Sequence, residues 1–408
     1  MKIKVAYISE YFSDGMGYSE NCLPQALERL GCEVRVFSSD LQVYGLNKDY
    51  RKIYEKFLGP PKVKPGDYNY SGTKVTRLKH IRFYKYVYMA GLKKTILRFN
   101  PHIIQFNSPI PLNLISMFYL KYPIIFTECH QHKSVAVPLE QWQNSPKQYL
   151  NFVWYRLSRT LLGKILSNKI SKCFAISQDC ALIANSHYGI PKYKIVQLPL
   201  GTDTYLFHPI KSNNERQKRI DIRESWGIDE GYIAAIYTGR LTIEKKPLLL
   251  AEAIDLLSKE GYKIIGIFVG DGIQSKLIKA KNNCKVIPFI KHTSLADIYR
   301  AADIGVWPAQ ESMSMLDAMA TGLPIIVSDK MGDVGRISNS GLTYKEDDVF
   351  SLKEAIKSLF DNNIRIGLGI NARKKAEKIY SWDAIASKLL DYYLADLAKK
   401  KKTHIRIL

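Results

Sequence analysis

Short runs of apolar and β-branched residues recur along the chain, and stretches with apolar residues at helical spacing separate them. The first such stretch, Leu23–Leu30, predicts a helix that ends at Gly31. Strands that alternate with helices are typical of parallel sheets wound by right-handed crossovers. In the first half of the chain we expect strands at Lys4–Ser9, Glu33–Ser38, His102–Phe106, Pro123–Thr127, Lys172–Ile176 and Lys194–Leu198.

A second series of the same kind follows Arg219. Pro247–Ser258 has apolar residues at helical spacing and predicts a helix. We expect strands at Tyr232–Thr238, Lys263–Val269, Val286–Phe289, Ile304–Trp307 and Pro324–Ser328. The pattern therefore predicts two Rossmann-like halves. The polar, charged stretch Ile210–Glu224 is the expected linker, and the crevice between the halves is the expected active site.

The chain carries a large excess of positive charge. Its 408 residues suit two domains, and 60 Lys+Arg against 38 Asp+Glu give a formal net charge of +22. Such an excess favours anionic partners, among them nucleic acid, phosphates and an anionic membrane face. A generally basic host proteome would explain it as well.

The cysteines and the apolar segments indicate the compartment. No two of the six cysteines have CxxC spacing, and none clusters with histidine at zinc-ligand spacing, so we expect reduced thiols. The apolar start Met1–Ser9 runs into Glu10 and fits a strand better than a signal peptide. No stretch reaches the roughly 18–20 apolar residues that span a bilayer. We therefore predict a cytoplasmic protein whose membrane contact, if any, is peripheral.

The segment Tyr237–Pro247 contains the strongest chemical signal. A predicted strand ends at Thr238, and Gly239, Arg240 and Lys245 follow. Residues after the carboxyl end of a strand face the ligand crevice in open α/β sheets. Two cations placed there can neutralise a diphosphate, with arginine as a bidentate fork and lysine as a point charge. A solvated loop in a lysine-rich protein is the alternative.

The segment Trp307–Pro324 also follows a predicted strand. We expect a helix to begin near Ser314, whose hydroxyl would cap it, and to end at Gly322. The backbone N–H groups of such a helix start form an anion site. Glu311 and Asp317 place carboxylates beside it that can accept hydrogen bonds from sugar or ribose hydroxyls. Both acids could instead simply favour the helix dipole.

Three further segments are weaker. Val269–Gly272 is a glycine-rich strand end. Asp14–Gly17 lacks the full GxGxxG, so we do not expect NAD binding, and its glycines could let a substrate approach the backbone. Thr127–His132 offers two histidines and an acid without a third ligand motif, so we predict a polar edge of the active site rather than a metal site.

In their order and spacing these segments resemble the retaining nucleotide-sugar glycosyltransferases of family 4, the glycosyl transferases group 1. The resemblance covers nearly the whole chain. It rests on Gln105–Pro111, the hinge Leu200–Pro209, Gly239–Leu241 with Lys245, the VGDG at Val269–Gly272, Ala302–Pro308 with Glu311, Asp317–Ile326 and Tyr380–Trp382.

The resemblance implies the GT-B fold, an α/β architecture of two Rossmann-like doubly wound parallel-sheet domains that face each other across a cleft. Residues 1–205 would form the acceptor-binding domain and residues 206–380 the donor domain. Residues 381–408 would form a C-terminal helix that packs back on the N-terminal domain, followed by a basic tail.

The resemblance also implies roles for individual residues. Arg240 and Lys245 would hold the donor diphosphate and stabilise the leaving group. Asp317 would bind the donor ribose, and His130 would lie at the sugar as a third catalytic residue. The complete donor set would be Gly239, Arg240, Lys245, Gly270, Phe289, Ile290, Glu311, Ser312, Met313, Ser314, Met315 and Asp317. The acceptor would meet Gly15, Met16, Gly17 and His132.

The chain departs from the family pattern at two places. The paired acids of the family are glutamates with seven residues between them, whereas five residues separate Glu311 from Asp317. A loop two residues shorter would explain this, and the difference weakens the assignment of Glu311 more than that of Asp317. The N-terminal Gly-Gly loop of the family is replaced by Gly15–Gly17, GMG.

The expected activity is retaining transfer of a hexose from a UDP- or GDP-sugar to a glycan, lipid-linked or small-molecule acceptor, in glycan biosynthesis. The nucleotide sugar would be a co-substrate, with no bound cofactor or metal. A GT-B nucleotide-sugar epimerase and a non-catalytic basic protein that binds nucleotides or membranes are the alternatives. No RNP, KH or helix-turn-helix signature supports nucleic acid as the partner.

The charge adds one expectation about the acceptor. The run Lys399–Lys402 follows the predicted helix Ser381–Leu397. Together with the net charge, it predicts a peripheral enzyme with an acidic or lipid-linked acceptor, held reversibly at an anionic inner membrane face. A solvated tail is the alternative.

Overall fold

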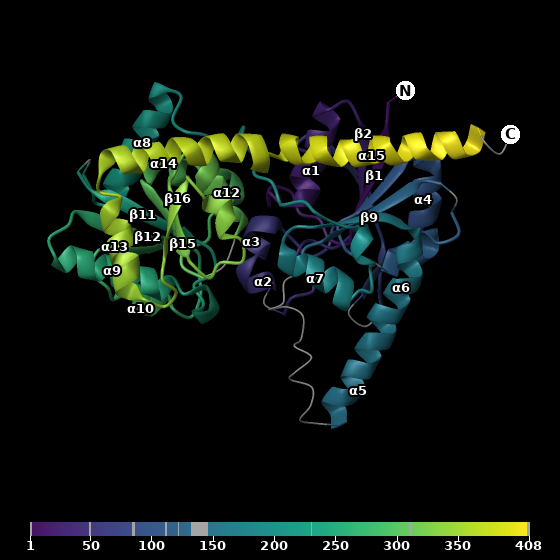
Figure 1. Ribbon diagram of the computed structural model, residues 1–408, viewed down its shortest axis with the longest axis horizontal. Coiled ribbons are helices and arrows are strands. Elements are labelled where there is room, and N and C mark those ends of the chain that lie inside the picture. Colours follow the sequence, from purple (N-terminus) through teal and green to yellow (C-terminus); the bar gives the residue numbers. More distant parts are fainter. Residues whose placement is uncertain are drawn as a thin grey trace. The chain divides into compact units, whose positions relative to one another are not determined.

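The chain folds into two compact units, shown in Figure 1. The computed structural model describes residues 2–48, 50–83, 86–110, 112–120, 122–131, 146–229, 231–309 and 312–405. Unit 1 comprises residues 1–200 together with residues 385–408, and unit 2 comprises residues 201–384.

Unit 1 is built on an eight-stranded sheet with the order β10-β9-β8-β7-β1-β2-β4-β3, in which only the pair β3–β4 is antiparallel. A separate antiparallel pair, β5–β6, adjoins it in sequence. The strands are β1 (Lys4–Ser9), β2 (Glu33–Ser39), β3 (Gly66–Tyr70), β4 (Thr73–Leu78), β5 (His80–Phe83), β6 (Tyr86–Met89), β7 (Ile103–Phe106), β8 (Ile124–Cys129), β9 (Ile170–Ala175) and β10 (Ile195–Gln197).

Helices connect the parallel strands of unit 1. They are α1 (Ser19–Arg29), α2 (Tyr50–Ile53), α3 (Glu55–Leu58), α4 (Leu92–Phe99), α5 (Pro146–Tyr155), α6 (Leu162–Leu166) and α7 (Gln178–Ser186). A π-helical turn, Arg156–Leu161, joins α5 to α6 without a break. The last helix, α15 (Trp382–Ile405), begins in unit 2 and belongs to unit 1 from Ile385 on.

Unit 2 is an all-parallel six-stranded sheet with the order β13-β12-β11-β14-β15-β16. Its strands are β11 (Ile233–Thr238), β12 (Ile264–Val269), β13 (Cys284–Ile287), β14 (Ile304–Trp307), β15 (Ile325–Ser328) and β16 (Gly341–Tyr344). Its helices are α8 (Asn213–Ser225), α9 (Pro247–Lys259), α10 (Ser275–Lys279), α11 (Leu295–Ala301), α12 (Met313–Ala320), α13 (Val349–Ser358) and α14 (Asn362–Lys375).

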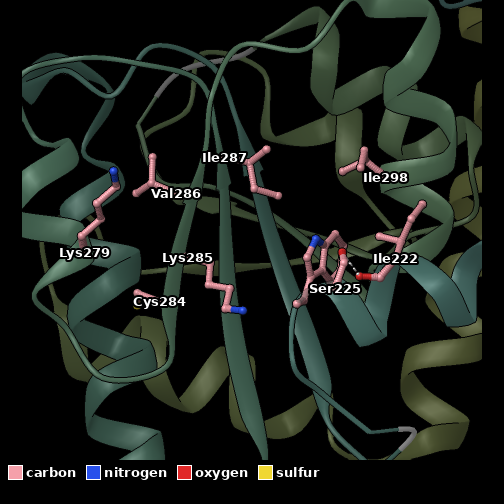
Figure 2. A pocket seen from close by; sticks show the side chains of 9 residues that line it. Ile222, Ser225, Lys279, Cys284, Lys285, Val286, Ile287 and Ile298 are labelled. Atoms are coloured by element: carbon pink, nitrogen blue, oxygen red, sulfur yellow. Dashed lines mark hydrogen bonds between the residues drawn. The ribbon is translucent and has the colours of Figure 1, made fainter.

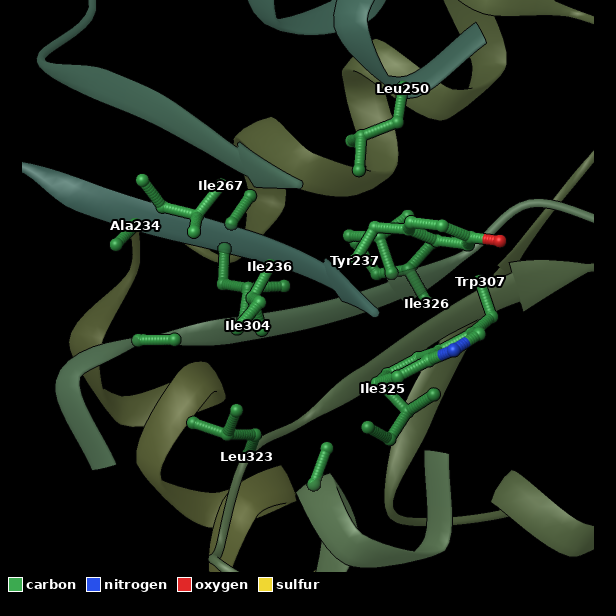
Figure 3. Packing of buried hydrophobic residues seen from close by; sticks show 14 of the residues in the cluster. Ala234, Ile236, Tyr237, Leu250, Ile267, Ile304, Trp307, Leu323, Ile325 and Ile326 are labelled. Atoms are coloured by element: carbon green, nitrogen blue, oxygen red, sulfur yellow. The ribbon is translucent and has the colours of Figure 1, made fainter. Parts of the chain in front are cut away.

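Burial of the central strands on both faces explains the apolar runs in the sequence. Every residue of β11, β12, β14 and β15 is buried, as in parallel sheets that are covered by helices on both sides. In unit 2, Tyr237 and Trp307 lie among isoleucines of these strands (Figure 3). The aromatic side chains at the ends of β11 and β14 thus extend the core to the carboxyl edge of the sheet.

The structure corrects the predicted linker. Most of Ile210–Glu224 forms α8, which begins with a capping box between Ser212 and Glu215 and belongs to unit 2. Arg219 and Arg223 of this helix pair with Asp303, at 2.7 and 3.0 Å. The segment is polar because one face of α8 is solvated, and its buried contacts are made by arginine rather than by apolar residues.

Candidate active site

The carboxyl edge of the unit 2 sheet assembles the segments that the sequence singled out. The strands β11, β12 and β14 end at Thr238, Val269 and Trp307. The amide of Gly239 donates to the Val269 carbonyl at 3.0 Å, and the amide of Gly270 donates to the Ile287 carbonyl at 2.9 Å. These bonds join the loops after β11 and β12 directly to the neighbouring strands.

Three glycines allow these two loops to touch through their backbones. Gly239, Gly270 and Gly272 have φ values of +149°, +144° and +159°, a region that favours glycine. A Cβ atom at Gly270 would lie 2.0 Å from the Gly239 carbonyl oxygen, and one at Gly272 would lie 2.3 Å from that of Leu241. This edge is therefore lined by backbone with no side chains at these three positions.

Two cations follow β11. The Arg240 side chain is 70% exposed, and its guanidinium lies 3.6 Å from the Glu244 carboxylate. Lys245 is half-buried in the short helical turn Ile243–Lys245, and burial together with the nearby Arg240 lowers its pKa. The next residue, Lys246, lies 2.7 Å from Asp347 and 3.1 Å from Glu346. Arg240 and Lys245 thus form a positive pair on one short loop.

Helix α12 begins one residue earlier than predicted. Its N-cap is Ser312, which makes no side-chain cap bond, and Ser314 lies inside the first turn. The predicted capping role of Ser314 is therefore wrong. Its hydroxyl donates to the Thr238 carbonyl at 3.1 Å and accepts from the Trp307 indole at 3.2 Å. These bonds hold the start of α12 against the end of β11.

The remaining predicted residues of this helix start differ in exposure. Ser312 and Met313 are half-buried, and the Ser312 hydroxyl lies 2.8 Å from that of Ser314. Met315 is fully buried in the core, and its amide already donates to the Ser312 carbonyl. The Met315 side chain therefore points into the core and not to the carboxyl edge of the sheet. Glu311 lies outside the described residues.

Asp317 is committed to partners within unit 2. Its side chain is 3% exposed, accepts from the Thr202 hydroxyl at 2.6 Å and lies 2.9 Å from His292 Nε2. Burial opposes the charged imidazole, but the Asp317 carboxylate outweighs burial, so the pKa of His292 is raised. A ribose could contact Asp317 only through a carboxylate that is 3% exposed and already has two partners.

His292 was missed by the sequence reasoning, although it lies close to two predicted donor residues. Phe289 and Ile290 follow β13, the first exposed and the second half-buried against the core. His292 comes two residues later and packs edge-on against Phe207, with ring centroids 4.9 Å apart. A histidine with no neighbouring motif carries no local signal, because its partner Asp317 is 25 residues away.

In unit 1, the predicted residues lie at the carboxyl edge of the other sheet. Gly15 and Gly17 adopt φ values of +73° and +68° in the loop between β1 and α1, with the half-buried Met16 between them. His130 follows β8, and its Nε2 lies 2.9 Å from Glu128 Oε2 without the alignment of a hydrogen bond. His132 lies outside the described residues.

A buried polar cluster surrounds Glu128 in unit 1. The Glu128 carboxylate accepts from Gln105 at 2.9 Å and lies 3.1 Å from the Tyr7 hydroxyl, and the Tyr393 hydroxyl of α15 donates to Gln105 at 3.0 Å. Burial raises the pKa of Glu20, at the start of α1, to about 7, while its own backbone amide and His130 oppose the shift. His130 is therefore 2.9 Å from one buried carboxyl group, that of Glu128, and interacts electrostatically with a second, that of Glu20.

A buried acid inside an apolar strand was the available signal for this cluster. Glu128 is a buried acid within the fully buried strand β8, and Glu20 lies on the buried face of α1. Buried carboxylates are rare unless they are paired, so an acid at either position indicates a buried polar partner. Glu10, which follows β1, is a third example, since burial raises its pKa to about 7.

A hollow of unit 2 lies away from this edge. It has a volume of about 490 Å³ beside the edge strand β13. Its lining comes from β13, α8, α10 and α11, and comprises Ile222, Ser225, Trp226, Lys279, Cys284, Lys285, Val286, Ile287 and Ile298 (Figure 2). No predicted site residue lines it, so the candidate site is defined by its charge and backbone geometry.

Comparison with protein families decides the interpretation. Residues 22–206 match the model of "Glycosyltransferase Family 4", and residues 218–379 match that of "Glycosyl transferases group 1". The chain belongs to this glycosyltransferase family. The second match contains the loops after β11 and β12 and the start of α12, and the first contains His130.

Individual relatives agree with the family. Spore coat protein SA of Bacillus subtilis is 24% identical over 252 residues, which cover 57% of this chain and 67% of the relative. Several D-inositol 3-phosphate glycosyltransferases are matched over about half of their own length. The chain therefore spans only part of several curated relatives that it matches.

Solved structures show the GT-B fold. Sucrose-phosphate synthase from Thermosynechococcus elongatus has a TM-score of 0.67 at 18% identity, with 98% of this chain and 100% of that chain covered. Anabaena HepE, solved in complex with UDP and glucose, has a TM-score of 0.64 at 15% identity, with 96% and 100% covered. The two units of this chain are therefore the two Rossmann-like domains of the GT-B fold.

Among the described residues, no three His, Cys, Asp or Glu side chains are grouped so that they could hold a metal ion. In the same part of the chain, no helix is long and apolar enough to cross a membrane.

Proposed function

We propose that the protein transfers a hexose from a UDP- or GDP-sugar to a glycan, lipid-linked or small-molecule acceptor, with retention of anomeric configuration. The observation that carries this proposal is the glycine-lined edge of unit 2, where Arg240 and Lys245 follow β11 and the start of α12 is bonded to the same strand. A diphosphate needs this combination of backbone donors and fixed positive charge.

The proposed chemistry uses these groups at the leaving group. As the bond between the sugar and the diphosphate breaks, negative charge develops on the diphosphate, and Arg240 and Lys245 stabilise it. Charges that are already in place cost no reorganisation during the reaction, which makes this the largest expected catalytic contribution. In unit 1, His130 orients the sugar, and its Nε2 lies 2.9 Å from the Glu128 carboxylate.

The nucleoside diphosphate is the cheapest probe of this function. We expect saturable, micromolar binding of either UDP or GDP to the full chain in a calorimetric titration, because the proposed site recognises the diphosphate itself. A non-catalytic membrane-binding protein would bind neither nucleotide, and that result would remove the proposal.

A second measurement separates a transferase from an epimerase of the same fold. A transferase incubated with its nucleotide sugar and acceptor releases the nucleoside diphosphate, whereas an epimerase changes the sugar and keeps the nucleotide attached. Proton NMR of the transferred sugar then reports whether the anomeric configuration is retained.

Asp317→Asn should weaken donor affinity about tenfold and slow turnover at saturating donor much less. Asp317 supports the donor side through His292, and loss of a charge-assisted bond costs about 1.5–3 kcal/mol. Calorimetric titration of the nucleoside diphosphate, together with kcat, checks this. Thr202→Val is the matched control, because it removes the other bond of Asp317 and leaves His292 paired. Normal affinity with lost activity would contradict the assignment.

The same variant has an expected pH signature. The folded pKa of His292 lies above its unfolded value of about 6.5. The stability that the pair contributes is therefore fully present below the unfolded pKa and is lost as pH rises through the folded pKa. The difference in melting temperature between wild type and Asp317→Asn should be larger at acidic than at alkaline pH.

The proposed localisation is cytoplasmic, with peripheral contact at an anionic membrane face. The structure draws part of the lysine run into contacts within the chain. Lys399 lies 3.2 Å from Asp396, and the Lys400 ammonium lies 3.9 Å from the centre of the Tyr122 ring. Two lysines of this run thus have contacts within the chain, although the Lys399 side chain stays 77% exposed.

A further inference from the structure

An exposed apolar stripe runs along the continuous helix of α5, the π-helical turn and α6 in unit 1. The stripe consists of five large residues that are each 50–68% exposed: Leu150, Trp154, Leu157, Leu161 and Ile165. Their spacing of four, three, four and four places them on one face of a helix. Figure 1 shows α5 projecting beyond the sheet of its unit.

The stripe is not explained by packing. Helices of soluble proteins turn their apolar face to the core, and large apolar side chains in a contiguous exposed row mark an interaction site. The base of the helix is anchored in the unit, because Gly163 approaches the Tyr188 backbone so closely that a Cβ atom there would lie 1.9 Å from the Tyr188 carbonyl oxygen. The helix that carries the exposed residues is therefore packed closely against unit 1 at Gly163.

The charge along this segment is of one sign. Between residues 146 and 178 the chain has six basic residues and no acidic one: Lys147, Arg156, Arg159, Lys164, Lys169 and Lys172. Lys164 is exposed on α6, within the span of the stripe. An apolar face on a purely cationic helix, with a tryptophan and leucines along it, is the pattern of helices that lie in the interface of a bilayer.

Aromatic and basic side chains continue this pattern at the base of the helix. Tyr119 and Tyr122 are exposed, and Lys400 lies over the Tyr122 ring. The Lys169 ammonium lies 5.4 Å from the centre of the Phe118 ring. Burial of Lys400 is the larger cause that lowers the pKa of Lys400, and the charge of Lys169 is the second. Exposed tyrosine rings near lysines are typical of the headgroup region of a membrane.

The apolar stripe, the basic residues and the exposed tyrosines occur together. From them we propose that α5–α6 is the element that docks the protein on an anionic lipid surface. It lies in the unit proposed to receive the acceptor, which suits a lipid-linked acceptor, so in that respect it deepens the proposed function. A second copy of the chain is the less favourable occupant, because two helices that each have four basic residues and no acid would repel each other.

Vesicle co-sedimentation tests the proposal without knowledge of the substrate. The full chain should sediment with vesicles of phosphatidylglycerol and phosphatidylcholine and stay in solution with phosphatidylcholine alone. Added salt should weaken binding, because the charges at the surface are screened. The variant Leu150→Gln/Trp154→Gln should lose at least tenfold in vesicle affinity, since both side chains are exposed in the free protein and the fold does not depend on them.

Two further variants make the result specific. Phe350→Gln/Ile370→Gln removes exposed apolar side chains from unit 2 and should bind vesicles as wild type does. Replacement of Lys399–Lys402 by glutamine should keep most of the affinity if the helix, rather than the tail, is the docking element. Trp154 emission should shift to the blue on anionic vesicles, and Trp154→Phe should abolish that shift while it preserves binding.

Three outcomes would overturn the proposal. They are equal sedimentation of the Leu150→Gln/Trp154→Gln variant and wild type, absence of wild-type binding to strongly anionic vesicles at low salt, and a dimer in light scattering that the same substitutions dissociate. Titration of UDP and GDP against each variant keeps this test separate from the proposed function, because nucleotide binding in unit 2 should be unchanged in all of them.

Discussion

The double variant Arg240→Ala/Lys245→Ala is expected to lose about a hundredfold or more in turnover while its melting temperature stays close to that of the wild type. In the proposed function each cation makes a charge-assisted contact with the donor diphosphate, and loss of one such contact costs about 1.5–3 kcal/mol, which is more than tenfold for each single variant. The fold is spared because Arg240 is largely exposed and Lys245 is half-buried in a surface loop.

Lys246→Ala is the matched control, because it removes a lysine from the same loop. Its ammonium is occupied by Asp347 and Glu346, so its loss should change stability by no more than about 1 kcal/mol and change turnover little. Release of the nucleoside diphosphate measures turnover, and calorimetry measures its affinity. Wild-type rates in both single variants would assign Arg240 and Lys245 to an ordinary solvated loop.

Gly270→Ala is expected to be the most destabilising single substitution at the candidate site. The added Cβ atom would lie 2.0 Å from the Gly239 carbonyl oxygen, which is backbone and cannot rotate away, at a φ of +144°. We expect a loss of about 4 kcal/mol or more, in the range reserved for severe core defects. For a unit of this size that corresponds to roughly 8–16 °C in melting temperature.

Gly261→Ala separates the clash from the backbone strain. Gly261 also has a positive φ, of +88°, but no atom lies within 4 Å of the Cβ position. Its substitution should therefore cost only about 1–2 kcal/mol, the strain of the left-handed region alone. If both variants melt at the same temperature, the loops after β11 and β12 do not touch, and the proposed backbone lining of the donor site is wrong.

The central strands could be predicted because burial on both faces leaves a continuous apolar run. β1 and β14 have the predicted bounds, and other central strands differ by one or two residues. The strands β3, β4, β5, β6 and β16 were not predicted. Half-exposed strands such as Gly66–Tyr70 have polar residues at most positions. The apolar-run criterion detects burial rather than strand conformation.

The candidate site was predictable only where one segment carries its chemistry. Arg240 and Lys245 share a loop, so their spacing is visible in the sequence. The carboxylate of Glu128 depends on Tyr7, Gln105 and, beyond Gln105, Tyr393. These residues come from four elements far apart in the chain, so no local pattern connects them. Ser314 illustrates the opposite error, since a serine near a helix start bonds the neighbouring strand instead of its own helix.

The assignment of residues 385–408 to unit 1 affects the order in which the newly made protein can fold. Tyr393 packs on Phe126 and bonds Gln105, so the core of the first unit includes side chains that are translated after all of the second unit. The second unit, residues 201–384, is continuous in the chain and can fold as a unit during synthesis. The first unit begins to form before the second, but its core is complete only once Tyr393 has been added.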